Sequence, residues 1–124
     1  MHRILLVEDN LNNIRLIKQL LEDIEREIEL VCAESGAVAL EKAVNYKFDL
    51  VLMDISLPDM DGITITKELK KLPGFWGVPF IAATAHAMVQ DEELFREIFD
   101  DYISKPIDDE LFTAKVEKWL GDIR

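Results

Sequence analysis

Four short apolar runs in this chain each end in a reactive polar group. The runs cover residues 4–7, 50–53, 80–83 and 102–104, and they lead into Glu8 and Asp9, Asp54, Thr84, and Lys105 respectively. Short apolar runs with polar ends are typical of buried parallel strands. Because parallel strands end at the same edge of a sheet, the pattern predicts that three carboxylates, a hydroxyl and an ammonium share one pocket.

Segments with helical spacing separate these runs. One apolar face consists of Leu11, Ile14, Ile17, Leu21 and Ile24, and polar residues suited to capping precede the second and fifth helical segments at Ser35 and at Asp108. Residues 63–66 alternate like a strand, although Ile65, Leu69 and Leu72 also fit a helical face. With a further strand at residues 28–33, the chain is predicted to alternate five strands with five helices. This predicts an α/β fold, a flavodoxin-like (βα)5 doubly wound parallel sheet in the order 2-1-3-4-5.

The size and charge of the chain restrict its class. Its 124 residues predict a single domain over residues 1–124, and its net charge of −11 argues against a nucleic-acid surface and favours proteins or cations as partners. The uncharged span at residues 72–90 is interrupted by Pro73, Gly74, Gly77 and Pro79, so no membrane helix is expected. A start without a signal-peptide pattern and a lone Cys32, expected to be buried and reduced, favour a cytoplasmic protein.

The predicted pocket is expected to bind a cation. Glu8, Asp9 and Asp54 repel one another without one, and oxygen ligands with no partner Cys or His favour a hard ion such as Mg²⁺. A calcium loop at residues 54–62 is a weaker reading because it lacks the terminal Glu and the flanking helices. A carboxylate beside a metal can also act as a nucleophile toward phosphorus. We therefore predict Asp54 as the nucleophile, with Thr84 and Lys105 neutralising charge on the phosphoryl oxygens.

The residues at the strand ends also resemble a known family. Val7-Glu8-Asp9-Asn10, the segment from Leu52 to Gly62, Ala83-Thr84-Ala85 and Tyr102-Ile103-Ser104-Lys105-Pro106 are similar to the receiver domain of two-component response regulators. The Glu-Asp-Asn opening is particularly similar to single-domain regulators of the cell-cycle type and to receivers of hybrid histidine kinases. The resemblance covers essentially the whole chain.

This resemblance implies a signalling role rather than an enzymatic one. Asp54 would accept a phosphoryl group from a phosphohistidine of a histidine kinase or phosphotransfer protein, and the phosphorylated domain would change its contacts with a downstream protein. Mg²⁺ would be held by Asp9, Asp54 and the backbone carbonyl of Ser56, with Glu8 assisting through water. Lys105 would pair with the phosphoryl group and Thr84 would close on it. The peptide before Pro106 would be cis.

The main alternative is a metal-dependent phosphatase of the haloacid-dehalogenase type, which also uses an aspartyl-phosphate. Such enzymes place a second Asp two residues after the nucleophile, where this chain has Ser56. A third reading is a receiver that only binds protein, but no pocket residue is missing. The sequence leaves two further points open: Phe75 and Trp76 could form an exposed patch or fold onto the core, and the Asp100-Asp101 pair stands where receivers commonly carry a glycine.

Overall fold

Five parallel strands form a single sheet at the centre of the molecule. The computed structural model describes residues 2–55, 62–84 and 96–121, and in them the strands lie in the order β2-β1-β3-β4-β5. The strands are β1 (His2–Val7), β2 (Ile28–Ala33), β3 (Leu50–Asp54), β4 (Phe80–Thr84) and β5 (Asp101–Ser104). The predicted flavodoxin-like α/β fold and strand order are confirmed.

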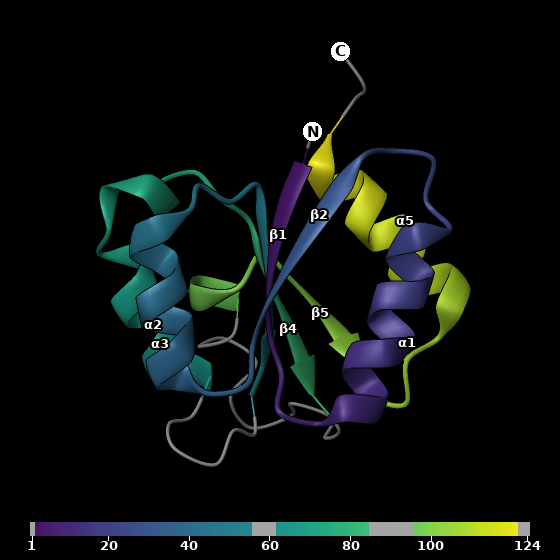
Figure 1. Ribbon diagram of the computed structural model, residues 1–124, viewed down its shortest axis with the longest axis horizontal. Coiled ribbons are helices and arrows are strands. Elements are labelled where there is room, and N and C mark those ends of the chain that lie inside the picture. The colour runs from purple at the N-terminus through teal and green to yellow at the C-terminus, as the bar shows by residue number, and fades with distance from the viewer. Residues whose placement is uncertain (1, 56–61, 85–95, 122–124) are drawn as a thin grey trace.

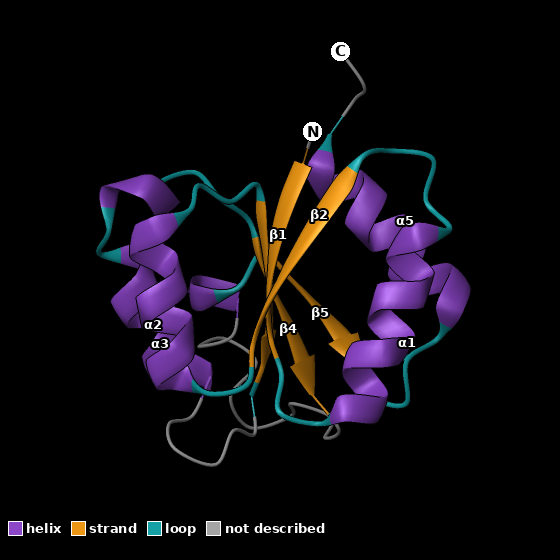
Figure 2. Ribbon diagram, in the orientation of Figure 1, coloured by secondary structure: helices purple, strands orange, loops and turns teal. Residues whose placement is uncertain are grey.

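Helices cover both faces of this sheet (Figure 1). They are α1 (Leu11–Glu22), α2 (Gly36–Asn45), α3 (Gly62–Lys70), the short 3-10 helix η1 (Pro73–Phe75) and α5 (Asp109–Leu120), and residues 96–98 are also helical. Helices α2 and α3 lie on one side of the sheet and α1 and α5 on the other, which gives three layers (Figure 2). None of the helices formed by the described residues is long and apolar enough to cross a bilayer.

Alternate residues of each strand enter opposite halves of the core, because successive side chains of a strand point to opposite faces of the sheet. The half under α2 and α3 includes Leu5, Val7, Val51, Met53, Phe80, Ala39, Ala43, Ile65 and Leu69. The half under α1 and α5 includes Ile4, Leu6, Leu50, Leu52, Ile81, Ile17, Leu20, Leu21, Phe112 and Val116. Because both faces of the sheet are buried, residues at the ends of the strands are the ones that remain available for a functional site.

Side chains cap three of the helix starts in the described part of the chain, and the sequence predicts two of these caps, Ser35 and Asp108. The side chain of Asn10 accepts hydrogen bonds from the backbone N–H groups of Asn12 and Asn13, that of Ser35 accepts one from Val38, and that of Asp108 accepts one from Leu111. Each cap satisfies backbone donors that a helix leaves unpaired at its first turn. Residues 63–66, which the sequence left open between strand and helix, lie in α3. This helix buries Ile65 and Leu69.

Three local expectations need correction or completion. Leu11 is exposed, so it does not belong to the buried face of α1, and Cys32 is half-buried rather than buried. Asp100, which stands where receivers commonly carry a glycine, pairs with the start of β4. The carboxylate of Asp100 accepts from the backbone N–H of Phe80 at 2.8 Å, and the N–H of Asp100 donates to the carbonyl of Phe80 at 2.9 Å.

Candidate functional site

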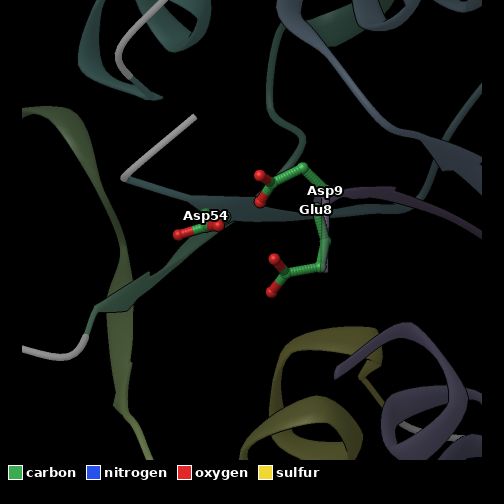
Figure 3. A group of neighbouring side chains, drawn as sticks. All are labelled: Glu8, Asp9 and Asp54. Carbon is green, nitrogen blue, oxygen red and sulfur yellow. The ribbon is translucent and has the colours of Figure 1, made fainter. Parts of the chain in front are cut away.

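Three carboxylates gather at the carboxyl edge of the sheet. Glu8 and Asp9 directly follow β1, and Asp54 is the last residue of β3, the neighbouring strand. One carboxylate oxygen from each of the three lies within 4.8 Å of the other two. Glu8 and Asp9 leave the end of β1 on opposite sides, and both carboxylates turn toward Asp54 (Figure 3). Glu8 and Asp54 are only 1% and 4% exposed, whereas Asp9 is exposed to solvent.

Strand register explains why the groups meet. Val7 pairs with Met53, Asp54 pairs with Ala83, and Thr84 pairs with Ser104. The residues at or just after these positions therefore follow one another across the edge of the sheet, as the sequence pattern predicted.

The ammonium of Lys105 joins two of the carboxylates. Its Nζ donates a hydrogen bond to Glu8 Oε1 at 3.0 Å and lies 3.3 Å from Asp54 Oδ1. Burial alone would lower the pKa of Lys105, but the carboxylates of Glu8 and Asp54 outweigh it and raise that pKa. Lys105 therefore remains a cation beside the two carboxylates.

The carboxyl group of Glu8 is buried, and burial makes its ionised form costly. Burial and the neighbouring carboxyl of Asp54 raise the pKa of Glu8, while the ammonium of Lys105 and a backbone hydrogen bond act to lower it. That hydrogen bond comes from the N–H of Asn10 to Glu8 Oε2 at 3.2 Å. Since Asn10 also caps α1, the position of Glu8 is tied to the start of that helix.

Thr84 and Lys105 are held to each other through the backbone. The N–H of Lys105 donates to the carbonyl of Thr84 at 2.8 Å, and Thr84 is 6% exposed at the end of β4. The peptide between Lys105 and Pro106 is cis, which confirms the expectation drawn from the family resemblance. Lys105 thus enters the site from a chain segment tied directly to the end of β4.

Gly62 lets the start of α3 pack closely against the end of β3, a role that the sequence did not predict. A Cβ at this position would lie 2.5 Å from the carbonyl oxygen of Asp54 and 2.9 Å from the Cα of Ile55. The N–H of Gly62 also donates to the carbonyl of Ile55 at 3.0 Å. The first turn of α3 can approach the end of β3 only because residue 62 has no side chain. The turn signal Asp61-Gly62 was visible in the sequence, but this close approach was not.

The donor set fits a hard divalent cation. Carboxylate oxygens are the preferred ligands of Mg²⁺, which commonly binds through one or two carboxylates and keeps several waters. The exposed position of Asp9 leaves this side of the cluster open to water. Among the described residues, this is the one group of three or more His, Cys, Asp or Glu side chains close enough to share an ion. The predicted ligand Ser56 lies outside the described residues.

Comparison with known proteins agrees with this geometry. Residues 4–117 match the family model of the response regulator receiver domain. The chain is 40% identical over 120 residues to the polar-differentiation response regulator DivK of Brucella ovis, covering 96% of both sequences. It is 45% identical over 108 residues to the signal transduction histidine-protein kinase BarA of Escherichia coli K12, a match that covers 86% of the chain and 12% of that kinase.

A solved structure is similar over nearly the full length. The receiver domain of the sensor histidine kinase PA1611 from Pseudomonas aeruginosa PAO1 superposes with a TM-score of 0.85 at 31% identity, covering 98% of each chain. That crystal structure has a magnesium ion coordinated in its active site cleft.

Proposed function

Because the chain belongs to the response regulator receiver domain family, whose members are signalling domains, we propose that Asp54 accepts a phosphoryl group and that Glu8, Asp9, Thr84 and Lys105 serve the transfer. The observation that carries this proposal is the cluster itself. Two nearly buried carboxylates and one exposed carboxylate meet at one edge of the sheet, with a single ammonium within 3.3 Å of the two buried ones.

The proposed step is an in-line displacement at phosphorus. An oxygen of the Asp54 carboxylate forms a bond to the phosphorus of a phosphohistidine, and the bond from phosphorus to the imidazole nitrogen breaks. The electron pair of that bond leaves with the imidazole, which takes up a proton, and Asp54 becomes an acyl phosphate. In this proposal the Lys105 ammonium and the Thr84 hydroxyl stabilise negative charge on the transferred oxygens.

Asp9 and Asp54 are proposed to hold Mg²⁺, with Glu8 acting through a bound water and the backbone carbonyl of Ser56 as a further ligand. When bound, the ion supplies positive charge that offsets both the carboxylates and the incoming phosphoryl oxygens. The carboxylate of Glu8 holds Lys105 in place at 3.0 Å, and the absence of a side chain at Gly62 lets α3 pack against the end of β3.

The phosphoryl donor is proposed to be a histidine kinase or a histidine phosphotransfer protein. Two exposed leucines support a protein partner beside the pocket: Leu11, in the first turn of α1, is 57% exposed, and Leu111, in the first turn of α5, is 50% exposed. Helices α1 and α5 pack side by side (Figure 1). Apolar side chains at this position can contact a donor while its phosphohistidine reaches Asp54.

The phosphorylated domain is proposed to signal by binding a downstream protein, and to do so in the cytoplasm, where kinases obtain ATP. In this proposal the chain is the acceptor and does not turn over a separate substrate. The alternative of a haloacid-dehalogenase-type phosphatase is not supported, since the matching family is that of the receiver domains.

Labelling with a small phosphodonor tests this function. The whole chain, incubated with acetyl phosphate and Mg²⁺, should gain the mass of one phosphoryl group. Asp54→Asn should abolish the gain, and chelation of the metal should slow it strongly. The surface change Glu41→Gln on α2 serves as the control, and it should label like the wild type. Labelling that survives in Asp54→Asn would contradict the proposal.

A further inference from the structure

An exposed tryptophan stands at the opposite edge of the sheet from Asp54. Trp76 is 71% exposed, although it directly follows Phe75, which is 3% exposed. The sequence left the placement of this pair open, and the structure separates the two residues. Large aromatic side chains are enriched in the contact surfaces of proteins, because they bury much apolar area with few rotatable bonds.

The segment that carries Trp76 is firmly anchored. The ring of Phe75 stacks on Phe48 with centroids 5.9 Å apart, and its centroid also lies 5.9 Å from that of the Phe80 ring. The backbone N–H of Trp76 donates to Pro73 at 3.2 Å, and that of Val78 donates to Phe75 at 3.1 Å. The tryptophan is therefore presented on an ordered turn, and binding a partner through it would cost little conformational entropy.

A hollow of about 450 Å³ adjoins this turn. Its apolar lining comes from Phe75, Val78, Pro79 and Trp119. The indole Nε1 of Trp119 already donates to Asp101 Oδ2 at 2.9 Å, so this ring offers the hollow an apolar surface. The volume is large enough for a large side chain, and the lining combines these apolar surfaces with the polar groups of Lys70, Gly77 and Asp100.

The polar groups of the hollow already have partners within the protein. Lys70 Nζ donates to the backbone carbonyl of Ile98 and lies 5.2 Å from the centre of the Phe80 ring. The carboxylate of Asp100 accepts from the N–H of Phe80 at 2.8 Å. The hollow itself therefore does not require a charged ligand. Charged groups of a ligand would instead be recognised by residues around the hollow.

The neighbouring end of α3 is basic in a strongly acidic chain. Lys67, Lys70 and Lys71 lie at i, i+3 and i+4, so they share one face of the helical end. Lys67 and Lys71 are exposed, and only Glu68 offsets them among residues 67–71. Residues 67–71 carry a net positive charge, so the remainder of the chain has a net charge more negative than the total of −11. This local reversal of sign favours an acidic partner at this position.

We propose that Trp76, the adjoining hollow and the exposed Lys67 and Lys71 form a docking site for an acidic peptide segment of another protein. An apolar side chain of that segment enters the hollow beside Trp119, and its carboxylates lie near the lysines. A long polyanion such as nucleic acid fits less well, because it would extend over the rest of the strongly acidic domain, whereas a short acidic segment contacts only the residues around the hollow. The site lies at the amino end of β4, and it does not depend on phosphorylation of Asp54.

Selection of peptides on the intact protein tests this site. Random short peptides displayed on phage are selected against the wild-type chain, and the affinities of the enriched sequences are then measured by fluorescence anisotropy. Enriched peptides should combine a large apolar residue with Asp or Glu. Their affinity should fall about tenfold or more in Trp76→Ala and by a smaller factor in Lys67→Glu, as expected for a central anchor and a charged rim.

Two control variants separate this site from the phosphoacceptor site. Leu111→Ala removes an exposed apolar side chain from the first turn of α5, and Asp54→Asn removes the acceptor; both should leave peptide affinity unchanged. Enriched peptides that keep full affinity for Trp76→Ala, or a selection that yields basic peptides or none, would overturn the proposal. Sedimentation with phosphatidylglycerol vesicles that depends on Trp76 would also overturn it, in favour of a membrane surface.

Discussion

Replacing Asp54 by Asn is expected to stabilise the metal-free domain, although Asp54 is almost completely buried. An oxygen of Glu8 and one of Asp9 each lie within 4.8 Å of an Asp54 oxygen. With an effective dielectric constant of about 20, each such repulsion is worth about 3.5 kcal/mol between full charges, and the attraction of an ammonium at 3.3 Å is worth about 5 kcal/mol.

The two repulsions therefore exceed the attraction by about 2 kcal/mol, and solvent around the exposed Asp9 reduces this to about 1 kcal/mol. Asp54→Asn keeps the shape of the side chain and removes the charge. For a domain of this size, about 1 kcal/mol corresponds to a rise of about 3 to 5 °C in the melting temperature.

The assay is thermal and urea unfolding of both proteins in EDTA, at mildly alkaline pH, which favours the ionised form of Glu8. Addition of Mg²⁺ should stabilise the wild type by about 1.4 kcal/mol when its concentration is tenfold above the dissociation constant, and the variant should gain much less. Glu41→Gln again serves as the matched acid-to-amide control and should behave like the wild type. An Asp54→Asn protein that is less stable than the wild type in EDTA would refute the electrostatic reasoning.

Three further substitutions test the surroundings of the site and the opposite edge of the sheet. Lys105→Ala should lower the free energy of unfolding by about 2 kcal/mol, because it leaves Glu8 buried without its cation, and urea titration measures this loss. Gly62→Ala should cost about 2 kcal/mol or more and slow labelling of the acceptor, because a Cβ would lie 2.5 Å from a backbone oxygen; Gly74→Ala, where a Cβ meets nothing within 4 Å, is the control. Burial alone would raise the pKa of Asp101, but hydrogen bonds from Trp119 and Lys115 outweigh it and lower that pKa. The ionised form therefore stabilises the fold above the ordinary Asp range, and this contribution is lost as the pH falls through the lowered folded-state pKa. Asp101→Asn should cost about 1 kcal/mol at neutral pH and nothing in strong acid, and equal losses at every pH would refute this.

Much of the fold follows from the order of short apolar runs and helical segments. Strand β2 has the predicted bounds, and Ser35 and Asp108 cap their helices as expected. These features are local, because a cap depends on the residues that immediately follow it and a strand depends on its own run of apolar residues.

The remaining features depend on contacts between distant segments. The exposure of Leu11 and the opposite placements of Phe75 and Trp76 depend on how helices and turns pack, which periodicity does not determine. The close approach of Gly62 to the backbone at Asp54, and the pairing of Asp100 with Phe80, likewise exist only once the chain has folded.

Identification of the phosphorylated residue tests the central claim most directly. Borohydride reduces an acyl phosphate on aspartate to homoserine, so the wild-type chain, labelled with acetyl phosphate and Mg²⁺ and then reduced, can be sequenced by tandem mass spectrometry. The account predicts homoserine at Asp54 in the presence of Mg²⁺ and almost none when the metal is chelated. Homoserine at Asp9 or at another aspartate, with Asp54 intact, would contradict it.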